Sequence, residues 1–206
     1  WTGEYLSGFD PDVNGEVRAV ALSPDAATVY IGGVFTEVNG QTRTKVAAVD
    51  ATTGNLKGGF NVTIPSSNVE AMVVNAAGDL FIGGSFFSVN GQGQRALALV
   101  DGTTGALKTW DANITTGKVT SLYLTSDESR LYVGTSIDDE DGDPTSGDLF
   151  AVNPSNASAI SGFNASGVDD PVLDIALTDS KIYLAMGGGG GEAQIVVNDL
   201  KGLIGP

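Results

Sequence analysis

One pattern of residues occurs four times along the chain, and it limits the fold more than any other feature of the sequence. In each copy an aromatic residue is followed by Asp or Asn, then by a polar turn and an apolar run. The aromatic residues are Phe9, Phe60, Trp110 and Phe163, at spacings of 51, 50 and 53 residues. A constant period of this length is typical of proteins in which each unit is one supersecondary module that buries its faces against its neighbours.

Each copy predicts short β-strands separated by turns. The first strand is a nearly continuous apolar run, which indicates that both of its faces are covered; these runs begin at Val17, Val69, Val119 and Val172. The second strand carries an aromatic residue at the same place in all four copies, at Tyr30, Phe81, Tyr132 and Tyr183. In the first two copies an Asn-Gly pair predicts a hairpin tip. A third strand and an Asp-x-Thr-Thr-Gly turn then lead to a fourth strand, at 56–60 and 107–110.

Four antiparallel strands in about 50 residues are the size of one propeller blade. No segment has apolar residues at helical spacing over ten or more positions, so we expect an all-β protein. The predicted fold is a single β-propeller domain over residues 1–206, built from four four-stranded blades. Its repeats span about 17–68, 69–118, 119–171 and 172–206.

The order of the strands raises the question of ring closure. Residues 1–9 hold only a fourth strand, and the last copy has strands one to three. We expect the N-terminal strand to complete the last blade, because closing the ring removes exposed sheet edges. The alternative is that these are four consecutive blades of a longer propeller.

Several charged residues have predicted places in this architecture. First strands line the central channel of a propeller, so we expect Arg18, Glu70 and Asp174 there, as paired and solvated residues or as a channel site. Arg43 and Arg95 precede the third strand in the first two copies, and either could bind an anionic ligand. We assign them the same position in the repeat, which favours a structural role instead. We therefore expect both to pack over the hairpin and to pair with a carboxylate or a carbonyl.

The composition excludes several kinds of chemistry. The chain has no cysteine, which excludes disulfides, thiol catalysis and thiolate metal sites. It has no histidine, which excludes a Ser-His-Asp triad, an imidazole base and a histidine-ligated zinc. The net charge of −15 repels phosphates, so we expect neither nucleic acid nor an anionic membrane as a partner. No run approaches the length of a membrane-spanning helix, and we predict no membrane insertion.

The segment from Gly32 to Gly54 carries a long string of residues, Gly-Gly-Val-Phe-Thr-Glu-Val-Asn-Gly-Gln-Thr-Arg and later Val-Ala-Ala-Val-Asp-Ala-Thr-Thr-Gly, and Gly83 to Gly105 repeats it closely. This string resembles the delta-60 repeat family of β-propellers. The third copy keeps only parts of it, and the fourth keeps less. The resemblance implies a propeller fold and an extracellular or cell-surface location, because such repeats occur in large secreted or surface-attached bacterial proteins. It carries no catalytic residues over to this chain.

A dense acidic loop stands where the first two copies have their Asn-Gly hairpin. Carboxylates at this density repel one another, and Ca²⁺, which accepts six to eight oxygens, would relieve that repulsion. Asp139, Asp141 and Asp143 have the alternate spacing of the first ligands of an EF-hand loop. An EF-hand is nevertheless excluded, because Pro144 stands at the sixth position, which requires glycine, and Phe150 at the twelfth, which requires glutamate. We weigh a solvated loop against an irregular calcium site formed by Asp138, Asp139, Asp141, Asp143 and Asp148.

Three asparagines that follow fourth strands fit the N-glycosylation pattern, namely Asn61, Asn113 and Asn164. The repeat favours Asn and turn residues at these places anyway, so the pattern alone is weak evidence for modification.

The function expected from these features is that of a non-enzymatic, secreted or cell-surface propeller. It would act as a structural or interaction module and bind other proteins or further copies of itself. The first alternative is a calcium-assisted module that binds glycans or another ligand through the acidic loop. The second is a carbohydrate-active enzyme that uses a pair of carboxylates about 5–10 Å apart.

Overall fold

The structure is a computed structural model that describes most of the chain. It describes residues 8–115, 117–136, 149–161, 163, 168, 170–178 and 180–187, together with the backbone of 193–199. Every regular element in these residues is a β-strand, which confirms the all-β prediction. The described residues contain no helix long and apolar enough to cross a membrane.

The strands form four three-stranded antiparallel sheets, one for each copy of the sequence pattern. The first sheet has the order β1-β2-β5, the second β10-β7-β6, the third β11-β12-β13 and the fourth β14-β15-β16. Their bounds are β1 Val17–Leu22, β2 Thr28–Gly33, β5 Val46–Asp50, β6 Val69–Val74, β7 Leu80–Gly84, β10 Leu97–Val100, β11 Lys118–Leu124, β12 Leu131–Ser136, β13 Leu149–Val152, β14 Val172–Leu177, β15 Lys181–Gly187 and β16 Ala193–Asp199.

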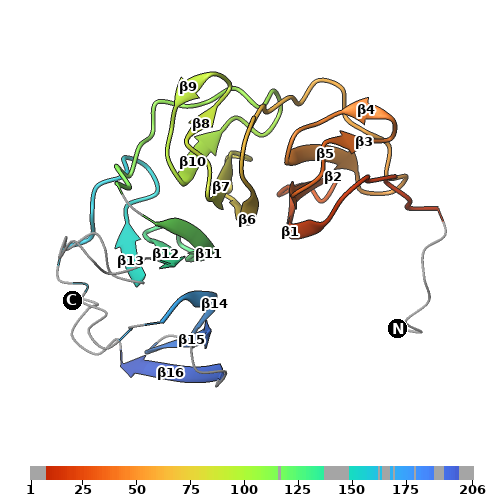
Figure 1. Cartoon of the computed structure of the whole chain (residues 1–206). Coiled ribbons are helices and arrows are strands. Elements are labelled where there is room, and N and C mark those ends of the chain that lie inside the picture. The colour runs from red at the N-terminus through yellow and green to blue at the C-terminus, as the bar shows by residue number, and fades with distance from the viewer. Residues whose placement is uncertain are drawn as a thin grey trace.

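Figure 1 shows these sheets following one another along a curved array, with the first strand of each sheet on the inner side. Consecutive inner strands lie beside one another, β1 against β6, β6 against β11 and β11 against β14. Within the described residues the array is an open arc, because β14 does not pack against β1 in this way. The predicted closure depends on the N-terminal strand, and residues 1–7 lie outside the described part of the chain.

The hairpin and turn predictions for the first two copies are confirmed. Two further two-stranded sheets, β3 (Glu37–Val38) with β4 (Gln41–Thr42) and β8 (Ser88–Val89) with β9 (Gln92–Gly93), flank the Asn-Gly tips. At the first tip both Asn39 and Gly40 have positive φ, 50° and 68°, as a two-residue hairpin turn of this kind requires. Asp50 caps its turn by accepting the amide hydrogens of Thr52 and Thr53, each at 3.0 Å.

The predicted four-stranded blades are wrong in one respect, because the fourth segment of the first three copies, where the structure describes it, is not a regular strand. It pairs with the third strand through isolated bridges alone, Val49 with Leu56, Val100 with Leu107 and Val152 with Ala159. In the first copy the exposed pair Gly58 and Gly59 comes two residues after Leu56, and glycine weakens a strand because it has no side chain to pack. The chain therefore leaves the sheet after one bridge.

Leaving the sheet places the recurring aromatic residue against the aromatic residue of the second strand. The ring centroids of Phe60 and Tyr30 lie 5.4 Å apart, those of Trp110 and Phe81 5.1 Å, and those of Phe163 and Tyr132 5.3 Å. Phe60 belongs to the core between the first and second sheets, and Trp110 to the core between the second and third. The sequence pattern is thus a set of aromatic pairs that hold consecutive sheets together.

All four inner strands contain a β-bulge at the same place, directly after their first valine. The bulged residues are Arg18, Glu70, Thr120 and Leu173. At three of these bulges the side chain reaches the neighbouring repeat. Arg18 Nη1 lies 2.6 Å from Glu70 Oε1, and the Thr120 hydroxyl donates to the Val172 carbonyl at 2.6 Å. The expectation of paired residues on the inner strands is confirmed for Arg18 and Glu70.

Candidate functional site

The acidic loop chosen from the sequence lies outside the described residues. Asp138, Asp139, Asp141, Asp143 and Asp148 all fall in the segment 137–148. Among the described residues, no group of three or more metal-ligating side chains lies close enough together to hold an ion. The calcium hypothesis therefore depends on that loop alone and stays a prediction.

The structure places two of the three predicted glycosylation sites. Asn61 and Asn113 are both exposed at the surface, and Asn164 lies outside the described residues. Asn61 follows the buried Phe60, and its backbone N–H donates to the Thr104 carbonyl at 3.0 Å. The modification of these asparagines also stays a prediction.

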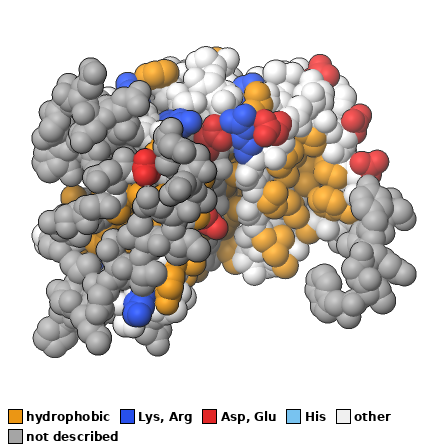
Figure 2. All heavy atoms as spheres, turned by 60° about the horizontal axis from the view of Figure 1, so that its bottom comes forward, with side chains coloured by type: hydrophobic (Ala, Val, Ile, Leu, Met, Phe, Trp, Pro, Cys, Tyr) orange, Lys and Arg blue, Asp and Glu red, His pale blue; other side chains and the backbone are white. Residues whose placement is uncertain are grey.

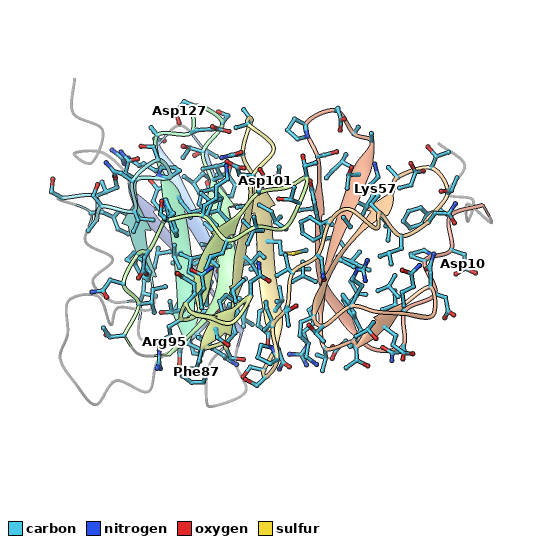
Figure 3. All side chains as sticks on the ribbon, turned by 90° about the horizontal axis from the view of Figure 1, so that it is seen from above. Asp10, Lys57, Phe87, Arg95, Asp101 and Asp127 are labelled. Atoms are coloured by element: carbon cyan, nitrogen blue, oxygen red, sulfur yellow. The ribbon has the colours of Figure 1, made fainter. Side chains whose placement is uncertain are left out.

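The described residues carry functional groups at two opposite ends of the sheets. We call the end with the turns after β1, β6 and β11 the turn end, and the end with the β3–β4 and β8–β9 hairpins the hairpin end. In Figure 3, Asp101 and Asp127 lie toward the turn end, and Phe87 and Arg95 lie toward the hairpin end.

A pocket of about 390 Å³ opens at the turn end between the first and second sheets. Its lining includes Asp25, Lys57, Asp79 and Asp101, with Tyr30 on the side of the first sheet. The Tyr30 hydroxyl donates to the Gly102 carbonyl at 2.8 Å and so connects the two sheets across the pocket. Burial, and then the charges of the three aspartates, raises the pKa of Tyr30, so this hydroxyl keeps its proton.

The carboxylates at this pocket already have partners within the protein. Hydrogen bonds from the Ser23 hydroxyl and the Ala27 amide lower the pKa of Asp25. The pKa of Asp101 is lowered by the backbone and hydroxyl groups of Thr104 and by the Thr103 amide. Asp79 forms an ion pair with Lys108 at 2.7 Å. Asp25 and Asp101 stabilise their turns in the ionised form, and that form cannot donate a proton.

The same chemistry predicts an acid-labile turn end. Hydrogen bonds from the Thr125 hydroxyl and from Ser129 lower the pKa of Asp127 to about 2. An unfolded aspartate titrates near about 3.9, so these hydrogen bonds contribute stability above that pH and lose it as the pH falls toward about 2. We expect the urea midpoint of unfolding to fall across this window and to fall less in Asp127→Asn. In a pH titration followed by carbon-detected NMR, the Asp127 carboxyl should have a pKa of about 2. A measured pKa of about 3.9, the value of an unfolded aspartate, would show that the hydrogen bonds from Thr125 and Ser129 are absent in solution.

The hairpin end carries an exposed aromatic residue. Phe87 is 58% exposed, whereas its neighbour Phe86 is 1% exposed. The guanidinium carbon of Arg95 lies 4.8 Å from the centroid of the Phe87 ring, within the range of a cation–π contact. Sequence reasoning missed Phe87, although the first repeat has Thr36 at the same place in a hairpin that is otherwise nearly identical.

The two arginines near the hairpins do not occupy the same position in the repeat. The amide of Arg43 donates to the Thr36 carbonyl, and it is the amide of Gln94 that donates to the corresponding Phe87 carbonyl. Gln94 is therefore the counterpart of Arg43, and Arg95 lies one residue later in the second copy than Arg43 does in the first. Arg43 binds the Thr42 carbonyl through Nη1 at 2.7 Å, as predicted, whereas Arg95 lies over an aromatic ring.

Comparison with known proteins identifies the fold. No protein-family model matches the chain, and no curated protein matches its sequence. Among solved structures, a chain of the mitotic checkpoint complex is similar, with a TM-score of 0.58, 18% identity and 89% of this chain covered. A GH74 enzyme of Niastella koreensis is similar at a TM-score of 0.56, with 13% identity and again 89% of this chain covered.

This chain spans about half of the first protein and less than a third of the second, 49% and 30% of their lengths. Both structural neighbours are β-propeller proteins. At 18% and 13% sequence identity, the likeness shows a similar course of the backbone and says nothing about the site residues. Together with its four successive antiparallel sheets, the likeness shows that this chain has a β-propeller-like fold.

Proposed function

We propose that this protein is a non-enzymatic, secreted or cell-surface interaction module whose four sheets are four propeller blades, and that it binds another protein through Phe87 and Arg95 at the hairpin end. The observation that carries the proposal is an aromatic ring that is 58% exposed and has an arginine over it. Aromatic residues and arginine are enriched in protein–protein interfaces and supply many of the residues that dominate binding energy.

The hairpin fixes the backbone beneath this ring before any partner arrives. Phe86 packs into the core between the first two sheets, and the neighbouring amides of Gln94 and Ala96 donate to the carbonyls of Phe87 and Phe86 at 3.1 and 2.9 Å. Because this backbone is already ordered, a partner that buries the ring has no loop to order at the same time. Phe87 therefore has the properties of an anchor residue.

The carboxylates at the turn end favour a binding role over the glycosidase alternative. A glycosidase of the usual kind needs one carboxylic acid with a raised pKa as its proton donor. In the pocket the pKa values of Asp25 and Asp101 are lowered instead, because the turns donate hydrogen bonds to both. The GH74 neighbour adds no support for catalysis, since its likeness is one of backbone.

Site-specific photo-crosslinking tests the proposal. A benzoylphenylalanine at position 87, presented to surface and secreted proteins of the source organism, is expected to give a discrete covalent adduct. The same probe at exposed Gln41, on the neighbouring hairpin, serves as the matched control and should give little. Arg95→Ala should weaken the adduct at position 87. Equal yields at 41 and 87, or no adduct at 87, would refute the role of this end.

A further inference from the structure

The first sheet exposes an apolar face that the other three sheets bury. We call the side chains that an inner strand turns toward the preceding sheet its head face. On β1 these are Val17, Val20 and Leu22, which are 38%, 64% and 52% exposed. Figure 2 shows apolar side chains gathered on the part of the surface formed by the first sheet.

The equivalent positions of the second, third and fourth sheets show what covers a head face. Val69 and Met72 are 0% and 9% exposed, and they belong to one core with Ala19 and Tyr30 of the first sheet. The same arrangement joins the second sheet to the third and the third to the fourth. We call the surface that a sheet turns toward the following sheet its tail face. In the described part of the chain, the head faces of the second, third and fourth sheets are thus each covered by the tail face of the preceding sheet.

Each of these three covering tail faces has glycine at one position of its second strand, Gly32, Gly83 or Gly134. A Cβ on Gly32 would lie 2.6 Å from Val69 Cγ1 and 3.0 Å from Met72 Sδ, and a Cβ on Gly134 would lie 2.8 Å from Val172 Cβ. The inner strand of the same tail faces has a small residue, Ala19, Ala71 or Ser121, each buried. Glycine and the small residue let the next sheet approach closely.

The tail face of the fourth sheet departs from this pattern at both positions. Asp174 stands where the other sheets have the small residue, and Ala185 stands where they have glycine. Both are exposed, and Tyr183 is only partly buried, whereas its counterparts Tyr30 and Phe81 are 3% and 0% exposed. A carboxylate is costly to bury without a partner, and the extra Cβ fills space that the neighbouring valine needs. The fourth sheet therefore has the polar outer face of a terminal repeat.

We propose that the head face of β1 binds the tail face of a further propeller repeat, one that lies outside residues 8–199 and has glycine on its second strand and alanine or serine on its inner strand. The fourth sheet of this chain is a poor occupant, because Asp174 and Ala185 oppose the packing seen at the three internal interfaces. Within the described residues, the apolar head face of β1 is thus uncovered, and the tail face of the fourth sheet carries an exposed carboxylate. This surface is distinct from the hairpin end, so the two proposals stand independently.

A test needs a protein that presents a matching tail face, and this chain can supply one. The donor carries Asp174→Ala and Ala185→Gly, which open its tail face, and Val20→Asp, which blocks its own head face. The acceptor is the unaltered chain. Because Val20 is 64% exposed, its replacement should leave the fold intact, and circular dichroism and thermal unfolding verify this for every variant. Physiological salt screens the repulsion between two acidic chains.

Sedimentation of the labelled donor with the acceptor is expected to give a 1:1 complex. The complex should be at least tenfold weaker with a Val20→Asp acceptor, and at least tenfold weaker with a donor that keeps Asp174 and Ala185. Failure of the opened donor to bind, or equal binding by the Val20→Asp acceptor, would overturn the proposal. Dimers of the unaltered chain that Val20→Asp abolishes would identify a second copy as the occupant and would also overturn it. If the triple variant does not fold, a donor with Val20→Asp and Ala185→Gly is expected to give the same order of affinities.

Discussion

Phe86→Ala is expected to lower the free energy of unfolding by about 4 kcal/mol, whereas Phe87→Ala should change it by less than about 1 kcal/mol. The two residues are neighbours in sequence with opposite environments. Phe86 is 1% exposed in the core between the first two sheets, and its truncation leaves a cavity. Phe87 loses only a surface contact with Arg95. Urea unfolding followed by tryptophan fluorescence and circular dichroism measures both values.

The same pair separates folding from binding. If the hairpin end binds a partner, Phe87→Ala abolishes binding in a protein of normal stability, and Phe86→Ala reduces stability first. A similar loss of stability in the two variants would show that the Phe87 ring is buried in solution, and would remove it as a surface anchor.

Gly84→Ala is expected to destabilise the protein by about 3 kcal/mol. The φ angle of Gly84 is not the reason; the cause is a close approach of two backbone segments. A Cβ on Gly84 would collide with the carbonyl oxygen of Asn68 and would lie 3.1 Å from the Cα of Val69. Neither group can rotate away as a side chain can, so the bulged inner strand itself would have to move. Thermal and urea unfolding of the variant measure the effect.

Gly58→Ala is the matched control for this substitution. Gly58 is exposed, no atom lies within 4 Å of the place that a Cβ would take, and its φ is not in the left-handed region. We expect a change within about 0.5 kcal/mol, or a slight gain from the reduced entropy of the unfolded chain. Equal stability of the Gly84 and Gly58 variants would mean that the close contact at Asn68 is absent in solution.

The period of the sequence was sufficient to predict most of the scaffold. Apolar runs, turn residues and Asn-Gly tips depend on local chemistry, so the first three strands of each sheet follow from them. The fourth strand could not be predicted in the same way. Whether Leu56 and Leu107 extend a sheet depends on competition between strand pairing and the packing of Phe60 and Trp110 on the next sheet, which is a tertiary effect.

The candidate surfaces were harder to predict, because exposure is a property of the assembled sheets. Val20 and Met72 occupy the same position in the repeat, yet one is 64% exposed and the other 9%. No pattern within a single copy distinguishes them. Phe87 does carry a local signal, since an aromatic residue replaces the polar Thr36 of the first hairpin at a place where the two copies otherwise agree closely.

The four bulges make the joints between sheets chemically unequal. Arg18 and Glu70 connect the first and second sheets through a partly exposed ion pair, whereas Thr120 and Ser121 connect the third and fourth through hydroxyl groups that donate to the Val172 carbonyl. Added salt screens the first connection and leaves the second nearly unchanged. An array whose sheets look alike can therefore loosen at one joint before the others, and the chemistry of a single bulged residue determines which joint that is.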